Sequence, residues 1–387
     1  MAERVEYVVV GLGALGSAAA AALGRAGHRV VGLDRFSLGH ERGASHDTSR
    51  ILRHSYHTPH HVRLSLQAYE DWADLERAAG EQLVSVVGGL DLFPRDGAIP
   101  AADYTASMTA CGVAYEELTG TAIRTRWPQL AVDDDTHGLF QQRAAIVPAA
   151  RGTAALQRVA RMRGAVLRDD SPVTSLHDRG AGGVEVVTGD VTYRARRVVV
   201  CADAWTSELL SGLGWELPLT VTQEQVTYLG VDDPPRYRPG ALPLWIWMDD
   251  PSYYGFPCYG EASIKAAQDC GGPVVATDRR SFEPDPARVR LLHAFVHKLL
   301  PGVGPPLRSK TCLYALTPDR EFVLSAVPGH EAVIVGLGAA HGFKFAPTFG
   351  RLLAELAVTG QTSFDVAPFR LDRATLTVPD HAVSWLV

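Results

Sequence analysis

A glycine-rich loop between two short apolar stretches constrains the fold of this chain more than any other feature. The run Val5 to Val10 predicts a buried parallel strand, Gly11-Leu12-Gly13-Ala14-Leu15-Gly16 follows it, and an alanine-rich helix extends to about Gly27. A second predicted strand, His28 to Leu33, ends at Asp34, 23 positions after the first glycine. This strand–turn–helix–strand order is typical of a dinucleotide-binding unit.

The residues of this loop suit a pyrophosphate for physical reasons. Gly11 permits a tight turn, Gly13 lets the backbone approach the pyrophosphate, and Gly16 lets the helix pack on the strand. The start of the helix offers free N–H groups and the positive end of its dipole. Asp34 can accept hydrogen bonds from an adenosine ribose. The loop therefore predicts a bound dinucleotide, but it does not separate FAD from NAD.

The composition of the 387 residues narrows the class of protein further. This length suits two domains, and 46% apolar with 21% charged residues is ordinary for a soluble enzyme. A net charge of −6 gives no electrostatic attraction to nucleic acids, and no apolar run is long enough to predict a membrane helix. The five cysteines lack a metal-binding spacing, and their odd number argues for a reducing compartment, so we expect a cytoplasmic protein.

A second glycine-rich loop, far along the chain, favours a flavin. The apolar run Ala332 to Val335 leads into a loop from Gly336 to Phe345, and a helix is expected from about Pro347 to Val358. A late helix of this kind holds the isoalloxazine end of a flavin, where its positive dipole end stabilises negative charge. We therefore expect a discontinuous FAD-binding domain of residues 1–85, 148–218 and 320–387, and a catalytic domain of residues 86–147 and 219–319.

Five motifs in order carry a resemblance to a known family. They are the loop at 11–16, Ser49-Arg50-Ile51-Leu52-Arg53-His54, Tyr253-Tyr254-Gly255-Phe256-Pro257 with Lys265, Lys310-Thr311-Cys312-Leu313-Tyr314, and His341-Gly342-Phe343-Lys344-Phe345. The chain resembles, from end to end, the monomeric sarcosine oxidases and N-methyl-tryptophan oxidases. The resemblance implies an α/β (α+β) flavoprotein of two domains: a Rossmann-like FAD-binding domain, and a catalytic domain with a large mixed or antiparallel β-sheet.

The resemblance also implies roles for individual residues. Cys312, which alone would be interpreted as a buried core thiol, matches the cysteine joined through sulfur to the 8α position of FAD. Arg53 and Lys344 match the cations that hold the substrate carboxylate, and Lys265 matches the lysine that promotes the reaction with oxygen. The candidate cofactor-binding residues are Gly11, Gly13, Ala14, Leu15, Gly16, Asp34, Arg35, His46, Arg50, Val173, Ala202, Trp205, Cys312, His341, Gly342, Phe343 and Lys344. The candidate catalytic residues are Lys265, Arg53, Lys344, Tyr254, Arg50, Asp269 and Tyr314.

The chain departs from the family pattern at three positions. Asp269 stands where sarcosine oxidases carry a histidine, Asp203 stands where a glycine is usual, and Ala340 replaces a glycine just before His341. Asp269 can orient a cationic amine or a second basic group of the substrate, or it can be a solvated loop acid. The sequence leaves these interpretations open.

An amino-acid substrate carries a carboxylate, and the cations of this chain suit a site that binds one. Arg53 can grip a carboxylate bidentately, and Lys344 can add a point charge. Arg50 and Arg53, three positions apart, are expected on one face at a helix end, which is unfavourable without an anion. Lys344 lies in a loop expected to be buried, where an ammonium also requires a partner.

Two further expectations concern aromatic residues and histidines. The aromatic stretch 244–259 is either a sheet face packed on a core or the wall of a pocket. The histidines His54, His57, His60 and His61 are expected at the surface, with no metal bound.

These observations predict a FAD-dependent oxidase of a secondary amine or N-methyl amino acid. It would act as a monomer and produce an imine and hydrogen peroxide with oxygen as acceptor. One alternative is an oxidase or dehydrogenase of a cyclic imino acid, or of another amine, in secondary metabolism. Another is a non-catalytic FAD-binding subunit of a complex, and a third is a nicotinamide dehydrogenase, in which Cys312 would have no use.

Overall fold

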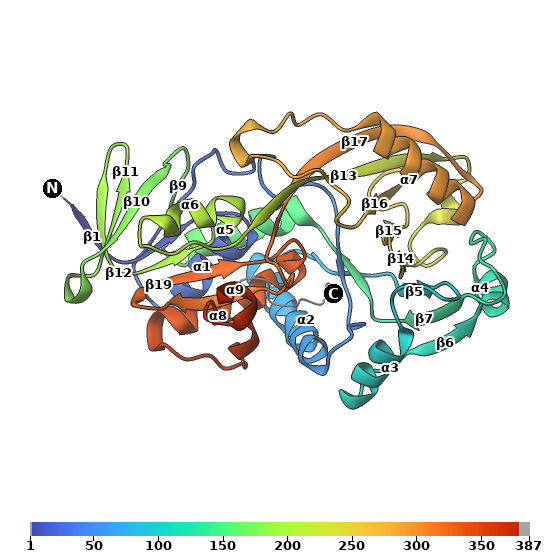
Figure 1. The fold of residues 1–387 in the computed structure, drawn as a ribbon, viewed down its shortest axis with the longest axis horizontal. Helices are drawn as coiled ribbons and strands as arrows, with labels where there is room; N and C mark the ends of the chain where they lie inside the picture. The colour runs from blue at the N-terminus through green and yellow to red at the C-terminus, as the bar shows by residue number, and fades with distance from the viewer. Residues whose placement is uncertain (1, 379–387) are drawn as a thin grey trace.

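The computed structural model describes residues 2–378 and arranges them in two lobes that lie side by side (Figure 1). Each lobe is built on an eight-stranded sheet, and a three-stranded sheet is also present. The predicted fold class, a mixed α/β chain with large mixed sheets, is confirmed. Within residues 2–378, no helix is both long and apolar enough to cross a membrane.

The first sheet contains the predicted dinucleotide-binding unit. Its order is β10-β11-β12-β1-β2-β9, and β19 pairs with both β12 and β18. Strands β9, β2, β1, β12 and β19 are parallel, so their carboxyl ends meet at one edge. The strands are β1 (Glu3–Val10), β2 (Val30–Leu33), β9 (Val166–Arg168), β10 (Val173–Asp178), β11 (Val184–Thr188), β12 (Thr192–Val200), β18 (Val323–Val327) and β19 (His330–Leu337).

Four helices accompany this sheet. They are α1 (Ala14–Arg25), α2 (Pro59–Ala79), α5 (Ala149–Met162) and α8 (Ala346–Thr359). Helix α1 packs against α5 and α8, and α2 packs against the same two helices. Helix α1 begins directly after Gly13, and α8 begins directly after the second glycine-rich loop, so both predicted junctions between loop and helix are present.

Close contacts between backbones explain why glycine is needed at these junctions. Gly11 has φ 88°, and a Cβ on Gly16 would lie 1.8 Å from the Gly11 carbonyl oxygen. A Cβ on Gly350 of α8 would lie 2.3 Å from the Cβ of Ala18 in α1. The glycines therefore let α1 approach the loop below it and α8 approach α1.

Two of the three departures from the family pattern lie in strained backbone. Asp203 has φ 47° and Ala340 has φ 75°, in the left-handed region that favours glycine. Asp203 opens a short 3₁₀ helix, η2 (Asp203–Trp205), and Ala340 precedes another, η5 (Gly342–Phe345). Both segments reach the carboxyl edge of the first sheet, where β12 and β19 end.

The second sheet is mixed, with order β17-β13-β16-β15-β14-β5-β7-β6. Helix α7 (Pro286–Leu299) contacts β13, β16 and β17, and the two long strands β13 and β17 run through the upper part of this lobe (Figure 1). The strands are β5 (Gly89–Phe93), β6 (Glu116–Thr119), β7 (His137–Gln141), β13 (Thr220–Val231), β14 (Leu244–Trp247), β15 (Tyr253–Phe256), β16 (Ser263–Gln268) and β17 (Val303–Leu316).

The small sheet has the order β3-β8-β4. Its strands are β3 (Arg50–Leu52), β4 (Ser85–Val86) and β8 (Ala145–Val147). The other α-helices among the described residues are α3 (Ala101–Ala110), α4 (Gly120–Arg126), α6 (Thr206–Ser211) and α9 (Ala374–Thr377). Strand β3 matters most for the site, because it carries Arg50 and leads directly to Arg53.

The contact between α1 and α8 gives a test of the packing. We expect Gly350→Ala to lower the free energy of unfolding by about 2 kcal/mol, because overpacking costs more than the gain of about 1 kcal/mol in helix propensity. Urea unfolding followed by circular dichroism measures the change. Gly189→Ala is the control, since a Cβ there meets nothing within 4 Å. Equal stability of the two variants would contradict the close helix contact.

Candidate active site

A large cavity of about 370 Å³ lies at the carboxyl edge of the first sheet. We call it the first cavity. It is lined by residues from the first glycine loop, by Gly336, Gly338 and Gly342 of the second loop, and by the segment after β12. The two glycine loops are therefore two walls of one cavity, although more than 300 residues separate them in the sequence.

The buried Asp34 holds the first glycine loop in shape. Its Oδ2 accepts a hydrogen bond from the Leu12 N–H at 2.6 Å, and its Oδ1 accepts one from the Phe36 N–H at 2.9 Å. The Asp34 carboxylate also lines the first cavity. Its predicted contact with an adenosine ribose stays a prediction.

Most of the predicted cofactor-binding residues line the first cavity. Gly16 instead lies beneath the loop, against Gly11, while His341 and Lys344 line a second cavity. The predicted residues found at the wall of the first cavity are Gly11, Gly13, Ala14, Leu15, Asp34, Arg35, His46, Arg50, Val173, Ala202, Trp205, Cys312, Gly342 and Phe343.

The second cavity, of about 130 Å³, adjoins the first. Four residues line both cavities: Arg50, Tyr314, Ala340 and Phe343. Of the predicted catalytic residues, all except Lys265 line the second cavity. Its apolar wall comes from Ile51, Ile99, Ile246, Met248 and Phe256. A planar cofactor that fills the first cavity would therefore end beside a small chamber with cations and an apolar wall.

The aromatic stretch 244–259 is both a sheet face packed on a core and part of a pocket wall, the two interpretations that the sequence left open. Along β14 and β15, Trp247 and Tyr253 pack with Phe295 of α7, whereas Ile246, Tyr254 and Phe256 face the second cavity. The alternation of side chains along a strand explains this division.

Arg53 is paired with a carboxylate of the protein itself. Its guanidinium lies 2.9 Å from Asp91 on β5, and the Ser55 hydroxyl donates a hydrogen bond to the same carboxylate. Both charged side chains are less than 10% exposed. The sequence analysis missed Asp91, although an acid inside the apolar run Gly89–Phe93 is a signal that could have identified it.

The argument that Arg50 and Arg53 share one helix face is wrong. Arg50 belongs to strand β3, and its guanidinium donates hydrogen bonds to the carbonyl oxygens of Ser49, Ala44 and His46 at 2.8 to 3.0 Å. Strand β3 ends at Leu52, so Arg50 and Arg53 do not lie on successive turns of a helix. Arg50 is hydrogen-bonded to the preceding loop, and Arg53 is paired with Asp91. The positions of these two cations therefore do not require an external anion.

Lys344 is different, because no carboxylate among residues 2–378 forms an ion pair with it within 4.0 Å, although Asp269 and Asp91 favour its charge from farther away. Its ammonium lies 5.6 Å from the centre of the Tyr56 ring, and its carbonyl oxygen accepts a hydrogen bond from the Trp72 indole at 2.7 Å. Burial, with Arg53 nearby, lowers the pKa of Lys344 to about 7. An anion bound in the second cavity would raise this pKa and supply the partner that the ammonium lacks.

Asp269 lies at the wall of the second cavity in an ion pair. Its carboxylate is 2.9 Å from the guanidinium of Arg320, and its backbone N–H donates to the Ser252 carbonyl at 2.9 Å. It is therefore not simply a solvated loop acid, and its role toward a substrate stays open. Sequence analysis did not identify Arg320, because its partner is 51 positions away in the sequence.

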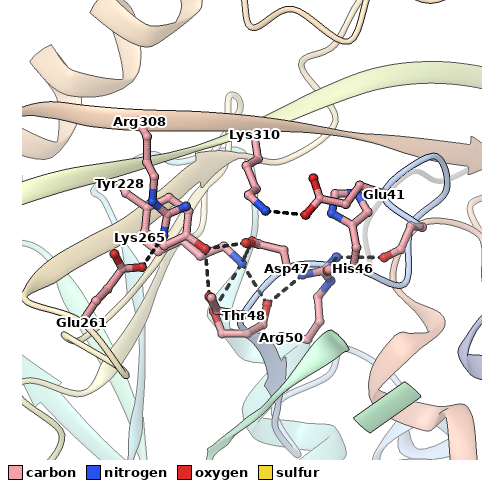
Figure 2. Close-up of polar contacts among 12 residues, drawn as sticks. Glu41, His46, Asp47, Thr48, Arg50, Tyr228, Glu261, Lys265, Arg308 and Lys310 are labelled. Atoms are coloured by element: carbon pink, nitrogen blue, oxygen red, sulfur yellow. Dashed lines mark hydrogen bonds and ion pairs between the residues drawn. The ribbon is translucent and has the colours of Figure 1, made fainter. Parts of the chain in front are cut away.

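Lys265 lies behind the cavities rather than in their walls. It is only 4% exposed, and its ammonium lies 3.0 Å from the Ser49 carbonyl oxygen and 2.5 Å from Asp47 (Figure 2). Burial, reinforced by Arg50, lowers the pKa of Lys265 to about 8, whereas Asp47 opposes this shift. Asp47 was also missed by the sequence analysis.

Two cysteines line the first cavity. Cys201 packs against Gly11, Gly16 and Gly336, beside the first glycine loop. Cys312 lies on β17, two residues before Tyr314, which lines both cavities. Burial raises the pKa of both thiols. Of the two, only Cys312 is next to the junction with the second cavity.

The expectation that the early histidines lie at the surface is wrong for two of them. His54 and His61 are buried, at 2% and 3% exposure, and His57 and His60 are half-buried. Aromatic neighbours explain this: His54 packs on Tyr69, and His61 packs on Tyr56. No group of three or more metal-ligating side chains is found among residues 2–378.

The two other predicted histidines differ in their surroundings. His46 lines the first cavity, and neither of its ring nitrogens has a hydrogen-bond partner in the part of the chain that the structure describes. His341 lines the second cavity, where its Nε2 lies 3.0 Å from the Arg320 carbonyl oxygen. Burial lowers the pKa of both rings, to about 4 for His46, so both are neutral at pH 7.

The Arg53–Asp91 pair leads to a stability prediction. We expect Asp91→Asn to lower the free energy of unfolding by about 3 to 5 kcal/mol, because it leaves a buried guanidinium without its countercharge. Glu116→Gln, which breaks the exposed pair with Arg126, is the control and should change stability by about 0.5 kcal/mol or less. Urea unfolding gives both values. A small effect of Asp91→Asn would show that Arg53 does not depend on Asp91.

Comparisons with known proteins agree with this geometry. The model of the DAO family, described as FAD dependent oxidoreductase, matches residues 6–356. The chain is 34% identical over 382 residues to a monomeric sarcosine oxidase from Streptomyces avermitilis, covering 95% of this chain and 97% of that relative. It is 30% identical over 377 residues to an N-methyl-L-tryptophan oxidase from Salmonella arizonae, covering 96% and 99% of the two chains.

Solved structures show the same similarity. The structure of NikD, an amino acid oxidase essential for nikkomycin biosynthesis, matches with a TM-score of 0.85 and 28% sequence identity. The match covers 95% of this chain and 97% of the NikD chain.

Proposed function

Because the chain belongs to the DAO family of FAD-dependent oxidoreductases, we propose that it oxidises a secondary amine or N-methyl amino acid with oxygen as electron acceptor. The resemblance inferred from the five motifs is confirmed, and so are FAD dependence and amine oxidoreductase activity. A nicotinamide dehydrogenase is thereby excluded. The observation that carries the proposal is the junction of the two cavities at Arg50, Tyr314, Ala340 and Phe343.

The first cavity fits FAD. The two glycine loops form two of its walls, and the N–H groups at the start of α1 suit a pyrophosphate. Asp34, Arg35 and Trp205 lie where the adenosine end would be held, and Arg50 and Phe343 lie at the other end. When bound, FAD supplies the oxidant for a C–N bond, which gives an imine, and passes two electrons and two protons to oxygen to give hydrogen peroxide.

The second cavity suits a small amino acid. Lys344, which lacks a carboxylate partner within residues 2–378, can take the substrate carboxylate, and Arg53 can share it while Asp91 holds the guanidinium in position. Tyr254 and Tyr314 are half-buried residues at the same wall, and desolvation of their phenols raises the pKa of each. Both therefore stay protonated and can donate hydrogen bonds to the substrate.

The apolar wall of Ile99, Ile246 and Met248 excludes water and can take the N-alkyl or ring carbons. A cyclic imino acid is the alternative substrate, because such a ring also combines a secondary amine with a carboxylate. The likeness to NikD favours an amino acid substrate in either case.

We propose that Lys265 promotes the reaction with oxygen through its positive charge, because a fixed cation stabilises a developing anion. Asp269 would orient the substrate amine, with Arg320 limiting how strongly it attracts a cation. These roles rest on the positions of the side chains and on the family resemblance.

Further proposals concern the whole molecule. The strands of the first sheet fall within 1–85, 148–218 and 320–387, and those of the second within 86–147 and 219–319, which supports the two-domain division expected from the sequence. Residues 379–387 of the last segment lie outside the described part of the chain.

We also propose that the protein is a monomer, because one of its relatives is named a monomeric sarcosine oxidase. The five cysteines form no disulfide, which supports a cytoplasmic location.

Anaerobic reduction of the purified yellow protein tests the activity. N-methyl and cyclic secondary amino acids should bleach the flavin absorbance, and admission of air should restore it with one hydrogen peroxide per cycle. A matched amine without a carboxylate should react with about 10- to 100-fold lower kcat/KM, because the contact with Lys344 is lost. A protein that holds FAD but is bleached by no amine would be the non-catalytic subunit, and return of colour without peroxide would indicate a dehydrogenase.

We also propose that Cys312 forms the covalent bond to FAD, because it lines the first cavity two residues before Tyr314, which lines both cavities. Acid precipitation of Cys312→Ala should release the flavin into the supernatant, whereas the wild-type protein and the matched control Cys201→Ala should keep it in the pellet. Absorbance of the two fractions gives the result. Flavin that stays attached in Cys312→Ala, or flavin released only from Cys201→Ala, would rule out this assignment.

A further inference from the structure

Asp47 occupies a position that an ordinary loop residue would avoid. Its φ is 78°, in the left-handed region, and its side chain is only 4% exposed. Left-handed backbone at a non-glycine residue costs free energy, and so does burial of a charge. Contacts of the carboxylate must offset both costs.

Two side chains of the second sheet supply these contacts. The Lys265 ammonium lies 2.5 Å from Asp47, and the Tyr228 hydroxyl donates a hydrogen bond to it at 2.6 Å. Tyr228 and Lys265 are directly opposite each other on the antiparallel strands β13 and β16, so both reach the same point from one face. Figure 2 shows the two side chains converging on Asp47.

Outer contacts fix both sides of this arrangement. The guanidinium of Arg308 lies 3.4 Å from the centre of the Tyr228 ring and pairs with Glu261 (Figure 2). On the other side, Arg50 is hydrogen-bonded to the carbonyl oxygens of the loop that carries Asp47. The carboxylate is thus held between the loop before β3 and the second sheet.

We propose that Asp47 is the positioning residue for Lys265: its carboxylate fixes the lysine side chain and keeps it a cation for the reaction with oxygen. This inference rests on the proposed function of Lys265. It adds a partner that determines the charge and place of that lysine.

The charges around Lys265 show in which direction its pKa should move when Asp47 is removed. Burial disfavours the Lys265 cation, and so does Arg50 on β3, while Asp47 stabilises it. Burial alone would raise the pKa of Asp47, but Lys265, Tyr228 and Arg50 together lower it to about 2, so this carboxylate is charged at any working pH. Without it, the pKa of Lys265 falls below about 8 and the side chain becomes neutral at lower pH.

Other titratable groups face the pair. Cys312 on β17 lies near the ammonium, and Glu41 and His46 lie near Asp47. Cys312 is uncharged both as a thioether to FAD and as a buried thiol, and burial keeps the His46 ring neutral at pH 7, so neither replaces the charge of Asp47. Glu41 is paired with Lys310 at 2.6 Å.

The proposal can be tested by NMR, because the chain has few lysines. Only Lys265, Lys298, Lys310 and Lys344 are present in the sequence, so an NMR titration of lysine labelled with ¹³C at Cε resolves each ammonium in the holoenzyme. In Asp47→Asn the midpoint of Lys265 should move down by about one pH unit or more, while that of Lys344 should not follow. Asparagine tolerates left-handed backbone, so the variant should fold. Asp47→Glu, which keeps the charge, should restore at least part of the shift.

Glu41→Gln is the matched control, because it removes a carboxylate that pairs with a different lysine. It should shift the titration of Lys310 and leave that of Lys265 unchanged. An unmoved Lys265 midpoint in Asp47→Asn, or an equal shift of Lys265 in Glu41→Gln, would overturn the inference.

Rates of reaction of the reduced enzyme with oxygen complete the test. In Asp47→Asn the fall in rate with rising pH should begin about one unit lower, so that the rate at pH 8 drops roughly fivefold, while the rate of reduction by substrate is spared. Adding Asp47→Asn to Lys265→Met should change nothing further. A faster oxygen reaction in Asp47→Asn would overturn the inference. A normal rate in Lys265→Met alone would instead overturn the proposed role of the lysine, independently of any shift in the titration.

Discussion

The site depends on how closely the backbone packs at the carboxyl edge of the first sheet. Gly11 turns with a positive φ, Gly16 lies against its carbonyl oxygen, and Gly350 brings α8 onto α1. Any Cβ at Gly16 or Gly350 would overlap backbone atoms, so the helices could not reach their positions. Because they do, two loops distant in sequence enclose one cavity, and β3 and β17 place Arg50 and Tyr314 where this cavity meets the next.

Paired charges lie in the wall of the second cavity or behind the two cavities. Arg53 is held by Asp91, Arg320 by Asp269, and Lys265 by Asp47. Each pair keeps a cation ionised at a place where burial opposes the charge. Lys344 makes no ion pair of this kind among residues 2–378, although Asp269 and Asp91 favour its charge from farther away, and this difference supports the proposal that it binds an anionic group of a substrate. Among these cations, Lys344 is thus the one that can still form an ion pair with a substrate.

The sequence predicted the parts of this arrangement that depend on local backbone geometry or on known motifs. The glycine loops, the helices after them, and the positions of Cys312, Arg53 and Lys344 at the cavity walls belong to this group, while the roles of these three residues stay predictions. Asp91, Arg320 and Asp47 were missed, since their partners are distant in sequence and no local pattern connects them. The shared helix face of Arg50 and Arg53 was predicted wrongly because spacing alone does not reveal that β3 is extended.

The central claim is that a flavin ring lies where the two cavities meet, with the substrate carboxylate beside Lys344. A crystal structure of the yellow protein with an unreactive carboxylate bound tests it most directly. We predict the isoalloxazine ring between Arg50, Tyr314, Ala340 and Phe343, and the carboxylate within ion-pair distance of Lys344. A ring bound away from these four residues, or a carboxylate that avoids Lys344 and Arg53, would contradict the account.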